Sequence, residues 1–164
     1  TRDTHEELEA SLQVLPRLRS PVERPALVRG YRRLLGGAAA SSEPWLGTTE
    51  GIVPSPVAGE PGASGPALGS KAEALGFHYV MAGSALGGRV MLRELERDGV
   101  DTAGFGFLDP HGARTGEVWR LLLGALEREL TEPDTLAQAV TGARKGFAFA
   151  RSCLESPACS EGHE

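Results

Sequence analysis

The stretch Gly83-Ser84-Ala85-Leu86-Gly87-Gly88 lies inside a long apolar run between residues 75 and 95. The run contains no proline and is too long for a strand, so we predict a helix. A glycine inside a helix costs about 1 kcal/mol relative to alanine. Gly83 and Gly87 are four residues apart and share a face, and the adjacent Gly87 and Gly88 favour a kink. The sequence therefore predicts a kinked helix with bare backbone along one side.

Two interpretations of this bare side follow from the spacing. In the first, the small residues let a second helix approach closely. In the second, the helix lies over the face of a planar ligand. The spacing of Gly83 and Gly87 does not separate them, so a second feature of the chain has to decide.

Length and composition favour one helical domain. The chain has 164 residues, enough for one domain with a sizeable core. We expect an all-α domain over residues 1–156 and a flexible tail over residues 157–164. The net charge of −5 and the lack of a basic block argue against non-specific binding to nucleic acid or to anionic membranes.

No apolar run reaches the roughly 18 residues that span a bilayer. No secretory signal is visible. Cys153 and Cys159 lie close together near the end of the chain and do not form a disulfide framework. These features predict a cytoplasmic protein.

The apolar periodicity and the helix-start signals predict about six helices. Proline at a first helical position after a capping residue marks two starts, at Ser20-Pro21 and at Glu132-Pro133. Segments 47–69 and 100–112 are rich in glycine and proline and are predicted loops, the second with Phe105, Phe107 and Leu108 buried beneath it. The predicted helices cover residues 1–15, 20–36, 71–75, the glycine-bearing run to about 98, 115–130 and 131–156.

His5 has two interpretations. It shares an apolar helical face with Leu8, Leu12 and Leu15. A lone histidine on such a face is commonly a core residue. The alternative is a metal ligand, because neutral imidazole is a favoured donor.

Two motifs, taken together, resemble the haem oxygenase family. Thr1-Arg2-Asp3-Thr4-His5, followed by Glu9, resembles the proximal-helix motif of these enzymes. Residues 79–88 (YVMAGSALGG) resemble their distal-helix motif and are similar to the bacterial branch that supplies biliverdin to phytochromes. Trp119, Arg120 and Phe147 fall at comparable places in the last third of the chain.

The resemblance implies a haem-oxygenase-like helical fold and a reaction. Haem b is both cofactor and substrate, and O₂ and electrons open it to biliverdin, CO and ferrous iron. A ferredoxin, a flavodoxin or an NAD(P)H-dependent reductase is then the expected partner. By the same resemblance, His5 is the metal ligand, and Arg2 and Arg120 pair with the haem propionates. The other implied residues are Gly83, Ser84, Gly87 and Gly88 at the catalytic wall, and Glu9, His78, Tyr79 and Phe147 around the cofactor.

The chain departs from the family pattern at three positions. Ser84 stands where animal members carry aspartate, Gly124 replaces an expected basic residue, and His78 stands where some members have tyrosine. The alternatives are a haem carrier or sensor that does not open haem, and a scaffold that binds no haem. Two further histidines have weaker interpretations: His163 with Cys153 and Cys159 as a metal site in the tail, and His111 as an exposed loop residue.

Overall fold

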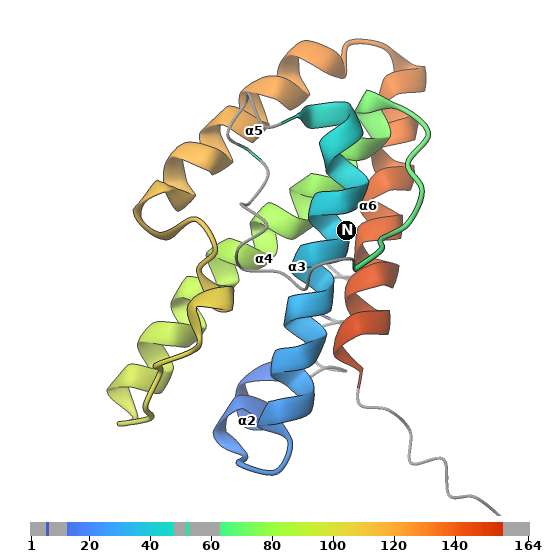
Figure 1. Ribbon diagram of the computed structural model, residues 1–164. Coiled ribbons are helices and arrows are strands. Elements are labelled where there is room, and N and C mark those ends of the chain that lie inside the picture. The colour runs from blue at the N-terminus through green and yellow to red at the C-terminus, as the bar shows by residue number, and fades with distance from the viewer. Residues whose placement is uncertain (1–5, 7–12, 48–51, 53–62, 156–164) are drawn as a thin grey trace, which may run out of the picture.

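Two long helices, α4 (Lys71–Arg97) and α6 (Pro133–Leu154), form the centre of the fold (Figure 1). The computed structural model describes residues 6, 13–47, 52 and 63–155. Within these residues every regular element is a helix, which confirms the predicted all-α class. The remaining elements are α2 (Val14–Arg19), α3 (Arg24–Leu46), the short 3₁₀ helices η2 (Gly106–Leu108) and η3 (Gly112–Arg114), and α5 (Thr115–Glu129).

Local side chains start α4 and α6 where the sequence predicts, whereas the helix predicted from Ser20-Pro21 begins at Arg24 as α3. The Ser70 hydroxyl accepts a hydrogen bond from the Glu73 amide at 3.1 Å, which caps α4. At α6, Glu132 and Thr135 form a reciprocal capping box ahead of Pro133. These caps satisfy amide groups that would otherwise lack a partner at the first turn of each helix.

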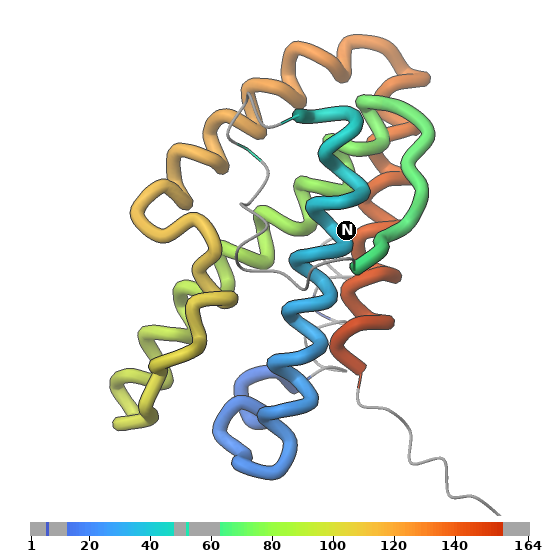
Figure 2. The backbone as a smooth tube through the Cα atoms, in the orientation of Figure 1, coloured from blue at the N-terminus to red at the C-terminus, as the bar shows by residue number. Residues whose placement is uncertain are grey.

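α4 and α6 pack backbone to backbone near their first turns. A Cβ atom added at Gly76 would lie 1.8 Å from the Ala139 carbonyl oxygen, and one added at Gly142 would lie 1.8 Å from the Glu73 carbonyl oxygen. Only glycine allows this approach. Beyond the crossing the two helices diverge, so their last turns lie well apart (Figure 2).

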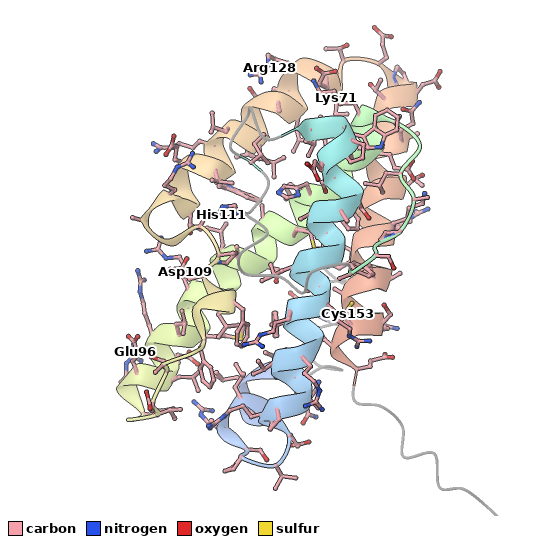
Figure 3. All side chains as sticks on the ribbon, viewed as in Figure 1. Lys71, Glu96, Asp109, His111, Arg128 and Cys153 are labelled. Atoms are coloured by element: carbon pink, nitrogen blue, oxygen red, sulfur yellow. The ribbon has the colours of Figure 1, made fainter. Side chains whose placement is uncertain are left out.

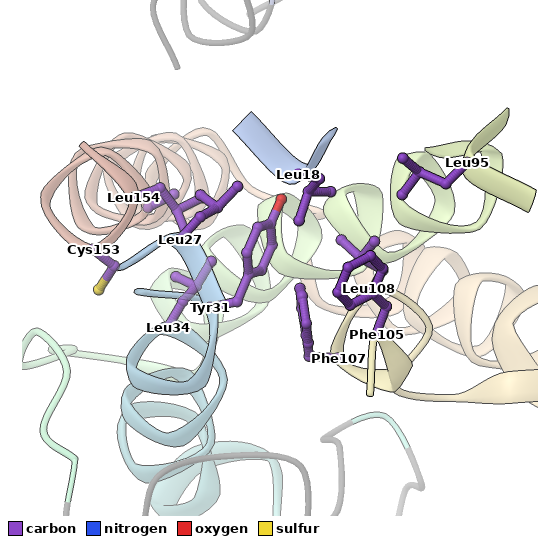
Figure 4. Packing of buried hydrophobic residues seen from close by; sticks show 11 residues of the cluster. Leu18, Leu27, Tyr31, Leu34, Leu95, Phe105, Phe107, Leu108, Cys153 and Leu154 are labelled. Atoms are coloured by element: carbon purple, nitrogen blue, oxygen red, sulfur yellow. The ribbon is translucent and has the colours of Figure 1, made fainter. Parts of the chain in front are cut away.

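Two hydrophobic clusters flank this crossing. One gathers Tyr31, Leu18 and Leu27 from α2 and α3 with Phe107 and Leu108 of η2, and extends to the last turns of α4 and α6 (Figure 4). The predicted burial of Phe105, Phe107 and Leu108 is confirmed. The other cluster joins the first turns of α4 to α5 and to the end of α3, and includes Leu46, Leu75, Phe77 and Leu122.

α3 does not end at Gly36-Gly37, as predicted, but continues to Leu46. A Cβ atom at Gly37 would lie 2.5 Å from the Phe149 ring and 2.7 Å from the Ser64 carbonyl oxygen. The glycine therefore serves close packing and does not terminate the helix. Similarly, the short helix predicted at 71–75 is the beginning of α4, which stays helical through its four glycines. The kink there remains a prediction.

Most of the helix predicted over residues 1–15 lies outside the described residues, although Glu6 is helical. α2 begins separately at Val14, after Gln13 in the left-handed region at φ 45°. Pro16 occupies the first turn of α2, where its missing amide hydrogen removes no helical bond. No helix among the described residues has the length and apolar character needed to cross a membrane.

Candidate functional site

A cleft of about 530 Å³ opens where α4 and α6 diverge. This volume lies within the range of about 300–1,000 Å³ that is usual for small-molecule sites. α4 contributes one wall, α6 the facing wall, and α2 and α3 close one end. The lining is mainly apolar and includes Val14, Tyr31, Leu34, Val80, Met91, Phe147 and Ala150.

Gly83 and Gly87 form the bare part of the α4 wall. A Cβ atom added to either glycine would meet no atom within 4 Å among the described residues. Among the described residues, the two positions therefore line the cleft and contact no neighbouring helix. Of the two interpretations drawn from the spacing, this arrangement favours the ligand-facing one for Gly83 and Gly87.

Ser84 and Phe147, two of the predicted site residues, also line the cleft. Ser84 follows Gly83 on α4 and supplies a hydroxyl group to the wall. Phe147 supplies an aromatic ring from α6. Among the described lining residues, Glu94 is the one charged side chain. The part of the cleft that the structure describes is thus suited to a flat, largely apolar molecule.

Gly88 lies on a different face of α4. A Cβ atom there would be 2.0 Å from the Leu108 carbonyl oxygen, so Gly88 lets η2 pack against α4. The family resemblance placed it at the catalytic wall with Gly87, but one residue rotates the helix by about 100°, so adjacent glycines face different neighbours. Gly88 belongs to the packing of the fold.

Tyr79 and Arg120, predicted at the cofactor, do not line the cleft. The Tyr79 ring stacks on Trp119 of α5, with ring centroids 5.2 Å apart, and is 42% exposed. Arg120 is exposed on α5. Tyr79 lies one turn before Gly83 on α4, but its ring packs on α5 and neither it nor Arg120 is among the residues that line the cleft.

His78 is buried beside the cleft and does not line it. Its Nε2 atom lies 2.8 Å from the Ile52 carbonyl oxygen, and its Nδ1 atom lies 3.5 Å from the Ser42 hydroxyl. Burial lowers the pKa of His78 from 6.5 to about 4, although the hydrogen bond to Ile52 partly opposes this. The ring is therefore neutral near pH 7 and can donate its Nε2 proton to Ile52.

A second, smaller cavity of about 30 Å³ adjoins the cleft. His78, Ser84 and His111 contribute polar groups to it, and the rest of its lining is mainly apolar. The sequence predicted that His111 is merely exposed, but the residue is only partly exposed, in the loop before α5 (Figure 3). The turn signal at Asp109-Pro110 was visible in the sequence, whereas the packing of this loop on Gly88 was not.

The predicted metal ligand and two of its neighbours lie outside the described residues. They are His5, Arg2 and Glu9. Their roles remain predictions from the family resemblance. In the tail, Cys153 is a buried residue of α6, while Cys159 and His163 lie outside the described residues. No group of three potential metal ligands occurs among the residues that the structure describes.

The chain is similar to a protein named "Heme oxygenase" from Xanthomonas campestris pv. campestris (strain 8004). The two are 33% identical over 152 residues, which cover 80% of this chain and 88% of that protein. The chain belongs to the haem oxygenase family. No family model and no solved structure matches the chain. Membership of a haem oxygenase family agrees with a cleft suited to a flat apolar ligand.

Proposed function

We propose that this protein is a haem oxygenase that opens haem b to biliverdin, CO and ferrous iron. The observation that carries the proposal is the open face of Gly83 and Gly87 on a cleft of about 530 Å³, in a chain of this family. A side-chain-free wall of this kind suits a macrocycle lying flat against the helix.

The described residues fit haem as a ligand. The cleft is large, mainly apolar and bounded by an aromatic ring at Phe147, which are features that bury a porphyrin from water. When bound, haem supplies the iron and the ring on which O₂ chemistry takes place. The resemblance assigns the iron ligand to His5 and propionate contacts to Arg2 and Arg120, and we retain these as proposals.

The protein itself would orient the haem and keep competing iron ligands away from it. Gly83 and Gly87 allow the α4 backbone to lie close to the ring, and residues 83–88 include no histidine, methionine, cysteine or lysine that could ligate the iron. If haem is bound against this wall, residues 83–88 would supply no ligand that competes with O₂ for the iron. Ser84 is the one residue of this segment that brings a side-chain hydroxyl to the wall.

Ring opening requires electrons that the protein does not store. We propose a ferredoxin, a flavodoxin or an NAD(P)H-dependent reductase as the donor, following the family resemblance. The similarity of residues 79–88 to the phytochrome-associated bacterial branch supports biliverdin as the product that the cell uses.

Haemin titration followed by aerobic reduction tests the proposal. The parent protein should bind haemin with a shifted Soret band and then, with ascorbate or ferredoxin, release biliverdin and CO. Gly87→Val places a branched side chain on the open wall and should slow ring opening about 10²-fold, because small misplacements at a reacting centre have effects of this size. Haem binding should weaken much less.

Gly124→Val on α5 is the matched control, because Gly124 lies away from the cleft and is nearest to the end of the Arg128 side chain. It should bind and open haem as the parent does. A stable haem complex that yields no biliverdin would favour the carrier or sensor alternative. An unchanged Soret band would exclude a haem site altogether, and parental turnover by Gly87→Val would exclude the role of the bare wall.

A further inference from the structure

The small cavity of about 30 Å³ shares part of its wall with the haem-sized cleft. Ser84, Tyr31, Met81 and Leu34 line both spaces. Ser84 is therefore accessible from the cleft on one side and from the side cavity on the other. The side cavity thus adjoins the part of α4 that carries Gly83.

Two histidines add further polar groups to this side cavity. The ring of His78 is fully buried and is fixed by the Ile52 carbonyl oxygen. His111 belongs to the loop that joins α4 to α5, next to Pro110, and is only partly exposed. A cavity of this volume accommodates about two water molecules, and a buried water needs two or more polar partners. Ser84 and the two histidines meet that requirement.

We propose that the side cavity holds water and that His111 passes protons from solvent through this water to Ser84 at the cleft. The inference rests on the proposed function, because the reduction of O₂ during haem opening takes up protons. The proton leaves a ring nitrogen of protonated His111 for a cavity water, and a proton of the connected water and Ser84 hydroxyl enters the cleft. His111 then regains a proton from bulk solvent, and no electron moves along this path.

The charges around His111 suit a residue that exchanges protons. Burial is the main cause that lowers its pKa, Arg114 of η3 lowers it further, and Asp109 raises it. Arg89 of α4 lies 3.7 Å from the Asp109 carboxylate, and His78 faces His111 across the cavity. His111 therefore loses its proton readily and is mainly neutral near pH 7.

The first test detects the water in the protein without haem. Cross-relaxation between water and backbone amides, measured by NMR, should show a long-lived water at the amides of Ser84 and Ala85. Ala85→Val adds two methyl groups to the side cavity without lining the cleft, and should remove the signal. The absence of a long-lived water in the parent protein would overturn the proposal.

The second test uses His111→Gln, which keeps a polar side chain of similar size but cannot exchange protons in this pH range. Its partly exposed position allows folding even if Ala85→Val is overpacked. In the haem-loaded protein the rate of ring opening should fall roughly tenfold or more, because proton transfer by a positioned group contributes about 10²–10⁴-fold. The parent's decline in rate as the pH rises through the pKa of His111 should disappear.

Asp101→Asn is the control, because it removes a charge from the same loop at an exposed position outside the cavity. It should keep the parental rate and pH profile. His111→Gln with the parental rate and profile would overturn the proposal. Failure of the parent to open haem would instead contradict the proposed function, and the water measurement would then still decide whether the cavity is hydrated.

Discussion

The glycines of α4 and α6 fall into two groups with opposite surroundings. In the N-terminal halves of the two helices, Gly76 and Gly142 lie against the backbone of the partner helix, whose carbonyl oxygens would be 1.8 Å from an added Cβ. Further along α4, an added Cβ at Gly83 or Gly87 would meet no atom within 4 Å among the described residues. Glycine thus permits close packing of α4 on α6 in one half of the molecule, the closed half, and lines the cleft in the other, the open half.

This difference separates what folding requires from what a ligand requires. The closed half holds α4 and α6 together, so its glycines are needed for the fold. The open half keeps glycines that cost about 1 kcal/mol each as helix residues and that allow no close helix contact among the described residues. Such a cost is expected at a site that serves function instead of stability.

The largest effect is expected at the closed half. Gly142→Ala should lower the free energy of unfolding by about 3 kcal/mol, at the upper end of the usual cost of overpacking, because the obstacle is backbone and not a flexible side chain. Urea denaturation of the haem-free protein measures this change. Gly124→Ala is the control and should gain stability, since alanine is the better helix residue. A loss of less than about 1 kcal/mol in the free energy of unfolding of Gly142→Ala would show that α4 and α6 move apart at little cost to admit the methyl group.

His78 gives the next largest effect and probes α4 just before the open half. Its pKa is about 4 in the folded protein and about 6.5 when unfolded, so the unfolded state binds more protons between these values. The contribution to stability is therefore complete above pH 6.5 and is lost as the pH falls toward 4. Between pH 7 and pH 5 the loss should be about 2 kcal/mol, at roughly 1.4 kcal/mol per pH unit.

His78→Gln tests this expectation, because an amide can still donate to the Ile52 carbonyl oxygen but does not titrate. Urea denaturation of both proteins at several pH values between 5 and 7 gives the difference. The parent should lose stability more steeply than the variant as the pH falls. Parallel curves would mean that the His78 ring gains a proton without leaving its buried site.

The sequence predicted much of the fold because helix starts are local. The cap and proline at Glu132-Pro133 act within one turn, so their meaning does not depend on distant parts of the chain. The same signal at Ser20-Pro21 predicted a start a few residues before α3 begins at Arg24. The end predicted at Gly36-Gly37 was wrong because the fit of Gly37 against Phe149 is a tertiary contact. A glycine that ends a helix and a glycine that admits a neighbour look the same in one sequence.

The site was predictable only in part, for the same reason. Gly83, Ser84 and Gly87 were identified by their motif and do line the cleft. Arg120 and Tyr79 were placed at the cofactor by analogy, but the face of α4 on which α5 packs is set by the whole core. His111 was predicted to be an exposed loop residue, because the contacts that bring its loop to α4, Leu108 against Gly88 and Asp109 near Arg89, are tertiary.

The smallest effect is expected at the open half, where Gly83→Ala should raise the free energy of unfolding by up to about 1 kcal/mol. No described residue lies within 4 Å of the new methyl group, and alanine restricts the unfolded chain. Urea denaturation without haem measures the gain. Haemin should then stabilise the variant less than it stabilises the parent, because stabilisation by a ligand follows its affinity. A loss of stability without haem would mean that the chain itself packs on Gly83, and the contrast between the two halves would not hold.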